Sequence, residues 1–207
     1  MRYSRIMTFK KLYNYFFVVL FMSFASSASA NNGITGVERH NIAKDHTNIV
    51  WYISHMGFSR TIGSFNEFEG IVDLNFDDPS KSKILITIQT DSITSGVTDL
   101  DQKLKGDQFF KVDEYPEASF ESTDITLIEN DTATVRGNFT MLGKTDEISL
   151  DVRFNKRAMD PILNRMRTGF SIKSSLQRSR WGMDQMLAFV SDEIAIVIEA
   201  EALRIAD

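Results

Sequence analysis

The chain has 207 residues, with 23 basic and 28 acidic side chains, three histidines and no cysteine. The absence of cysteine excludes disulfide bonds, thiol chemistry and zinc–thiolate sites. A formal net charge of −5 is unfavourable for contact with phosphate backbones, so we do not expect a nucleic-acid partner.

The first 30 residues have the pattern of a cleaved signal peptide. Arg2 and Lys11 belong to a basic start, an apolar run covers residues 16–25, and Ala28-Ser29-Ala30 offers small residues for cleavage. The apolar run is shorter than the about 20 residues of a transmembrane helix, so an uncleaved anchor is the less favoured alternative. We therefore expect one periplasmic domain, residues 31–207, without stable membrane insertion after cleavage.

The signal peptide also hides the charge of the mature domain. It contains four of the 23 basic residues and none of the 28 acidic ones, so residues 31–207 carry a formal charge of −9. Such a domain is poorly suited to nucleic acid or to an anionic membrane surface.

The mature chain is dominated by alternation of apolar and polar residues. Eight segments show this period of two, which is typical of antiparallel strands with one buried face: residues 49–53, 68–76, 84–88, 118–127, 133–141, 148–154, 168–176 and 194–200. Turn residues at 129–131 and 142–146 predict hairpins, and residues 155–164 are predicted to form a longer loop.

One segment departs from the strand pattern. Leu100 and Leu104 are four residues apart, which predicts a short helix near residues 98–105. Thr98 is placed to cap the first turn together with Asp101, and Gly106 is a natural end. The two phenylalanines at 109 and 110 are expected to fold back onto the body of the domain.

The fold class that follows is all-β. Eight antiparallel strands with one apolar face each bury that face by closing into a barrel, which also removes the sheet edges. An eight-stranded barrel is just wide enough either to be filled by its own side chains or to hold one small ligand. Both alternatives remain open from the pattern alone.

Short motifs along residues 44–203 resemble the YceI-like polyisoprenoid-binding family. The matching pieces are Trp51-x-Ile53-x-His55-x-Gly57, Gly63-x-Phe65-x-x-Phe68-x-Gly70, Asp101-x-x-Leu104, Tyr115-Pro116-x-x-x-Phe120, Gly137-x-Phe139-Thr140-x-x-Gly143 and Arg178-x-x-x-Gly182. Their combined order and spacing carry the resemblance, which implies a secreted, lipocalin-like barrel with an apolar tunnel for a polyisoprenoid or similar lipid. Lys103 stands where relatives usually have a histidine, a departure that bears on the head group of the ligand.

The resemblance implies a set of ligand-binding residues. Apolar residues expected to line the tunnel are Trp51, Ile53, Phe68, Leu74, Ile86, Phe139, Leu150, Phe170 and Ile196. From the pattern alone, the favoured alternative is a solid core. His55 is in phase with the inward residues and Arg178 precedes the last strand, so both are candidates for a polar head group. For His55 we favour the alternative of hydrogen bonds to loop carbonyl groups. For Arg178 we favour the alternative of capping the barrel through carbonyl groups and an acidic partner such as Asp192 or Glu193.

No catalytic residue, metal site or cofactor is predicted. His40, His46 and His55 fit no compact metal site, and no nucleophile or phosphate-binding motif is present. The expected ligand is an isoprenoid lipid or a quinone, and a homodimer is among the oligomeric states left open. Two other functions remain as alternatives: an enzyme that acts on an amphipathic substrate at the barrel mouth, with His55 and Arg178 together, and a stress-linked structural or interaction module with a filled core.

Overall fold

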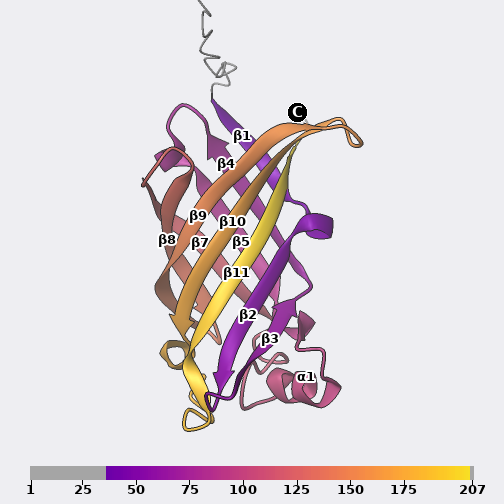
Figure 1. The fold of residues 1–207 in the computed structure, drawn as a ribbon, viewed down its shortest axis with the longest axis vertical. Helices are drawn as coiled ribbons and strands as arrows, with labels where there is room; N and C mark the ends of the chain where they lie inside the picture. Colours follow the sequence, from indigo (N-terminus) through magenta and orange to yellow (C-terminus); the bar gives the residue numbers. More distant parts are fainter. Residues whose placement is uncertain (1–35, 206–207) are drawn as a thin grey trace, which may run out of the picture. The chain divides into compact units, whose positions relative to one another are not determined.

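The computed structural model describes residues 36–205 (Figure 1). The predicted signal peptide, residues 1–30, and the start of the mature domain lie outside the described residues. Over the described range the chain forms eleven strands and one α-helix, as expected for an all-β protein. Across residues 36–205, no helix has the length and apolarity that a membrane crossing would need.

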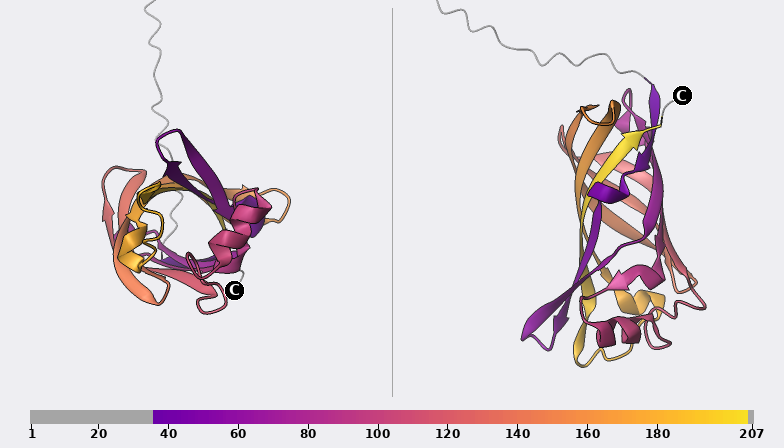
Figure 2. Two further views of the ribbon diagram at one scale, coloured as in Figure 1. Left: turned by 90° about the horizontal axis from the view of Figure 1, so that it is seen from below. Right: turned by 90° about the vertical axis from the view of Figure 1, so that its right-hand side faces the viewer.

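Eight of the strands within residues 36–205 close into an antiparallel barrel, which confirms the predicted architecture. In ring order they are β1 (Val37–Ile42), β4 (Phe68–Asn75), β5 (Lys83–Gln89), β7 (Glu117–Leu127), β8 (Thr132–Met141), β9 (Lys144–Asp160), β10 (Arg165–Gln177) and β11 (Val190–Arg204). The end of β11 pairs back onto β1 through His40 and Arg204, so the sheet has no free edge at this end. Figure 2 shows the resulting ring of strands in the view along the barrel.

The remaining strands extend the other end of the barrel. β2 (Asn48–His55) pairs with the first part of β11 and forms a hairpin with β3 (Ser59–Phe65), which pairs with the short β6 (Ile93–Thr94). Thr47 lies between β1 and β2, where its hydroxyl bonds with the backbone of Glu201 and so ties this step to β11. The predicted strand at 49–53 is therefore β2, whereas β1 closes the ring and was not predicted.

The helix α1 (Thr98–Lys105) has the predicted bounds, but its predicted cap is wrong. Val97 is the N-cap, and Asp101 instead accepts hydrogen bonds from the hydroxyl groups of Thr94 and Ser95 and from the Ser95 backbone N–H. The loop before the helix therefore uses this carboxylate, and Thr98 is left exposed. Phe110 folds back as expected: it is buried, and its ring packs edge-on against Phe65, with ring centroids 5.6 Å apart.

The connections on the β8–β9–β10 side differ from the prediction in one place. The β8–β9 hairpin turns at Leu142 and Gly143, both with positive φ, as the turn residues indicated. The predicted loop at 155–164 is wrong, because β9 continues to Asp160 and β10 begins at Arg165. This extension pairs in register with β10 beyond a bulge near Gly169.

Candidate ligand-binding site in the barrel interior

The predicted lining residues from apolar strand positions face the inside of the barrel. Trp51 and Phe68 are 8% and 4% exposed, and register places Trp51 opposite Ile196 on β11. The other seven are partly buried: Ile53, Leu74, Ile86, Phe139, Leu150, Phe170 and Ile196. Many of these residues pack against one buried apolar cluster that includes Phe120, Val135 and Trp181.

The partial burial of these inward residues is informative. In a filled core, side chains pack at crystal-like density and retain almost no accessible surface. Here Ile86, Leu150 and Ile196 keep accessible surface although they point away from the outer face of the sheet. Neighbouring side chains therefore do not fully cover these inward residues, and the interior walls that they form are aliphatic and aromatic.

The end of the barrel near α1 is held by Arg178, which is 1% exposed. Its Nε donates to the carbonyl of Ser191, Nη1 donates to those of Met183 and Gln185, and Nη2 donates to that of Val190. Burial lowers the pKa of Arg178, whereas the negative charges of Asp192 and Asp184 raise it by a smaller amount. This arrangement matches the capping alternative, because each guanidinium nitrogen already donates to a backbone carbonyl group.

The neighbouring acidic and aromatic groups complete this cap. The Asp192 carboxylate accepts from the backbone N–H and the hydroxyl of Ser179. Trp181 packs edge-on against Phe139, with ring centroids 5.5 Å apart, and donates its indole N–H to the Phe139 carbonyl. Hydrogen bonds of Arg178, Asp192 and Trp181 thus hold the turn at this end of the barrel.

His55 does not join Arg178. It is exposed at the end of β2, paired in register with Val190. Among residues 36–205, no hydrogen bond or ion pair links the two side chains that the enzyme alternative would bring together. An exposed imidazole at a strand end is less suited to hold a buried head group than the sequence pattern indicated.

The two inward glycines make room for neighbouring side chains. A Cβ on Gly70 would lie 2.3 Å from Cδ1 of Ile86, and one on Gly137 would lie 2.4 Å from Cζ of Phe120. Real Cβ atoms do not come this close to other atoms, so the barrel's own side chains require glycine at both positions. Gly137 also lies next to the register shift between β7 and β8.

The opposite end of the interior is polar, which the sequence did not predict. Five side chains from four neighbouring strands gather there, here called the polar cluster: Glu38 and His40 of β1, Arg157 of β9, Thr168 of β10 and Arg204 of β11. Glu38, His40 and Thr168 are 8%, 0% and 0% exposed, whereas the alternate residues Val37 and Arg39 face outward.

An ion pair crosses the interior at the polar cluster. Nη2 of Arg157 donates to both carboxylate oxygens of Glu38, at 2.7 and 2.8 Å. Because β11 and β10 separate β1 from β9 in the ring, this contact spans a chord of the barrel. Nη1 of Arg204 lies 3.5 Å from the same carboxylate, and the Arg157 guanidinium stacks over Phe76 at 5.0 Å.

His40 is the least exposed member of the polar cluster. Its Nδ1 lies 3.1 Å from the backbone carbonyl of Glu38, which can only accept, so Nδ1 carries the proton. Burial lowers the pKa of His40, and the positive charges of Arg157 and Arg204 lower it further. Glu38 acts in the opposite direction and raises this pKa, but by less than burial lowers it. The ring is therefore neutral at neutral pH, with a bare lone pair on Nε2.

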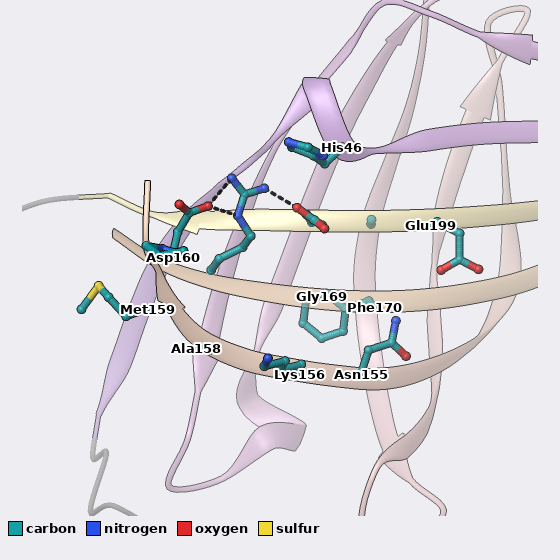
Figure 3. A pocket seen from close by; sticks show the side chains of 13 residues that line it. His46, Asn155, Lys156, Ala158, Met159, Asp160, Gly169, Phe170 and Glu199 are labelled. Atoms are coloured by element: carbon teal, nitrogen blue, oxygen red, sulfur yellow. Dashed lines mark hydrogen bonds and ion pairs between the residues drawn. The ribbon is translucent and has the colours of Figure 1, made fainter. Parts of the chain in front are cut away.

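A pocket of about 330 Å³ lies around η1 (Lys44–His46) and segments of β9, β10 and β11 (Figure 3). It is lined by His46, Lys156, Met159 and Glu199 among others, and Phe170 reaches it as well. Arg167 forms ion pairs there with Asp160 and Glu201, marked by dashed lines in Figure 3. Within residues 36–205, no group of three or more His, Asp or Glu side chains is arranged to hold a metal ion.

These features define a class: a closed antiparallel barrel with an apolar interior, one hydrogen-bonded end and one polar end. Sequence comparison gives the particular family. A YceI-like domain is matched over residues 40–202, so the chain belongs to the YceI-like family. Related sequences include UPF0312 proteins of Pectobacterium atrosepticum, 28% identical over 86% of this chain and 91% of the relative, and of Pseudomonas aeruginosa PAO1, 30% identical over 77% and 82%.

Solved structures share the fold. BcnA of Burkholderia cenocepacia matches with a TM-score of 0.70 at 20% identity, covering 77% of this chain and 98% of that one. The YceI protein of Campylobacter jejuni matches at 0.66 and 25% identity, over 74% and 90%. A polyisoprenoid binding domain from Saccharophagus degradans matches at 0.63 and 9% identity, over 82% and 100%.

Proposed function

We propose that this protein binds the hydrocarbon chain of a polyisoprenoid or similar long-chain lipid inside its barrel, and sequesters or carries it in the periplasm. The observation that carries the proposal is the set of inward aliphatic and aromatic residues that keep accessible surface within a closed barrel. The structural likeness to a polyisoprenoid binding domain supports the same ligand class.

The energetics favour a chain over a small polar substrate. Burial of apolar surface contributes about 0.8 kcal/mol per methylene, so a chain of several isoprene units needs few polar contacts to bind. The walls supply such an environment, with Ile86, Leu150 and Ile196 from three separate strands. A carrier of this kind needs no reacting group, which agrees with the separate environments of His55 and Arg178.

The test is the lipid content of the native protein. Protein purified without detergent from the envelope of the cells that make it would be extracted with organic solvent, and the extract analysed by mass spectrometry. We expect an isoprenoid lipid in near-stoichiometric amount. An empty extract, together with failure of the protein to take up added isoprenoid alcohols, quinones and phosphates, would contradict the proposal.

A further inference from the structure

The polar cluster has hydrogen-bonding groups that the chain itself does not use. Among residues 36–205, Nε2 of His40, Nε of Arg157 and Oγ1 of Thr168 are buried and have no hydrogen-bond partner. A buried polar group that stays unpaired destabilises the folded protein, because it has lost its hydrogen bonds to water. Three of the four such atoms lie together at this end of the interior, the fourth being Nε1 of Trp51 on β2. Their grouping points to a ligand group that pairs with them.

The types of these groups restrict the ligand. Nε2 of His40 is an acceptor, because Nδ1 holds the ring proton and donates to the Glu38 carbonyl. Nε–H of Arg157 is a donor, and the Thr168 hydroxyl can do either. The complementary ligand group must therefore both donate and accept a hydrogen bond.

Charge restricts the ligand further. The Arg157 guanidinium is already neutralised by the Glu38 carboxylate, and Nε2 of His40 lies only 3.7 Å from that carboxylate. An ionised phosphate would add negative charge beside Glu38 and offers no proton to His40. The Arg204 side chain is 42% exposed and keeps contact with water, so it does not require a buried anion. A quinone carbonyl only accepts and would leave His40 unpaired.

We propose that the polar cluster binds the terminal hydroxyl group of an isoprenoid alcohol. This inference rests on the proposed function, because the chain attached to that hydroxyl must lie in the apolar interior. The register supports this continuity: His40 faces Val72 on β4, and Thr168 faces Ala202 on β11, so apolar residues adjoin the polar end. The head would lie at the β1 end and the tail would extend toward Trp51 and Phe139.

The test uses lipid-free protein and three probes with the same C20 chain: geranylgeraniol, its methyl ether and its monophosphate. The ether accepts but cannot donate, so it isolates the bond to His40. We expect the alcohol to bind about tenfold more tightly than the ether, as one hydrogen bond at a buried site predicts, and more tightly than the phosphate.

Variants assign the preference to the polar cluster. His40→Leu should bring the alcohol-to-ether affinity ratio to near one, and His40→Gln, which keeps an acceptor, should retain part of it. Thr168→Val, nearly isosteric and without a chain partner to lose, should lower alcohol affinity while the protein stays folded. Arg39→Gln changes the neighbouring outward residue of β1 and should leave the ratio unchanged.

The outcomes separate this inference from the proposed function. Binding of all three probes with equal affinity, or tighter binding of the phosphate, would overturn the hydroxyl site and leave the carrier function intact. A ratio that survives in both His40→Leu and Thr168→Val would also overturn it, because the preference would then arise elsewhere. Failure of every C20 probe to bind would instead contradict the proposed function.

Discussion

The ion pair across the barrel gives a quantitative prediction. Arg157 and Glu38 have side chains only 11% and 9% exposed, and they meet through two hydrogen bonds. Replacing Arg157 with Met leaves the carboxylate buried, with the 3.5 Å contact to Arg204 and the 3.7 Å approach of His40 Nε2 as compensation. We expect the free energy of unfolding to fall by about 3–5 kcal/mol, the usual result of removing one partner from a buried pair.

The double variant tests whether the loss belongs to the pair. Glu38→Leu combined with Arg157→Met removes both charges and leaves apolar groups that can pack together. Such replacements of whole pairs are often neutral, so we expect the double variant to lie within about 1 kcal/mol of the parent. The two single losses would therefore fail to add, as expected for residues in direct contact.

The assay is urea unfolding of lipid-free protein, followed by the fluorescence of Trp51 and Trp181. Lipid must be absent because a bound ligand adds its own stabilisation to the folded state. A loss below about 1 kcal/mol in Arg157→Met would refute the reasoning, since that is the range of surface ion pairs. Additive losses in the double variant would refute it as well.

Three further predictions concern Gly137, Asp192 and the N-terminus of the mature protein. Gly137→Ala should cost about 1–3 kcal/mol of unfolding free energy, because its Cβ would meet Phe120 and the Glu121 carbonyl at 2.4 and 2.5 Å, and an unchanged urea midpoint would contradict this. Hydrogen bonds from Ser179 lower the pKa of Asp192 below its usual 3.8, so their stabilisation is present above that pH and is lost as pH falls through the folded pKa. The difference in unfolding free energy between the parent and Asp192→Asn should therefore be greatest at neutral pH and shrink as the pH falls below 3.8, and a constant difference would show that the carboxylate charge is not involved. N-terminal sequencing of the envelope protein should read from Asn31, whereas an intact Met1 in the membrane pellet would identify residues 1–30 as an anchor.

The apolar half of this barrel could be predicted from the sequence because its strands follow one rule. Where inward residues are aliphatic or aromatic, as at Phe68 to Leu74 or Ile194 to Ile198, the period of two is plain. The helix at 98–105 was predicted for the same reason, from the spacing of Leu100 and Leu104. The N-cap of this helix was not predicted correctly. Asp101 can either support the first turn of the helix or accept hydrogen bonds from the preceding loop, and only the folded loop brings Ser95 close enough to donate to it.

Two of the errors in the strand prediction, the missed β1 and the loop predicted over the end of β9, have one cause. β1 and the end of β9 place Glu38, His40 and Arg157 on their inward faces, so neither segment shows apolar alternation. Charged residues are almost never buried unless they are paired, and the partners here are 119 residues apart in the chain. No local pattern could reveal them, and a conflict between local pattern and fold is expected at a functional site.

The head-group candidates illustrate the same limit. Sequence phase made His55 a candidate and the position of Arg178 made it a second one. The structure leaves His55 exposed and commits Arg178 to carbonyl groups. Three of the four buried unpaired polar atoms of residues 36–205 lie at the other end, on Arg157, Thr168 and His40, and the fourth is Nε1 of Trp51. His40 was considered only as a weak metal ligand. The polar character of that end arises from strand closure between β1 and β11, which is a tertiary property.

The most direct test of the central claim, that a lipid chain occupies the barrel, is lipid occupancy in two matched variants. Leu150 faces inward on β9 and the next residue, Asp151, is exposed on the outer face. Leu150→Trp and Asp151→Trp would be purified in parallel, and bound lipid and thermal midpoint measured on the same samples. We predict that Leu150→Trp loses its lipid while its fold survives, and that Asp151→Trp keeps both. Full lipid occupancy in Leu150→Trp, with a large fall in its thermal midpoint, would indicate that the interior is a filled core and that the lipid binds outside it, and would contradict the claim.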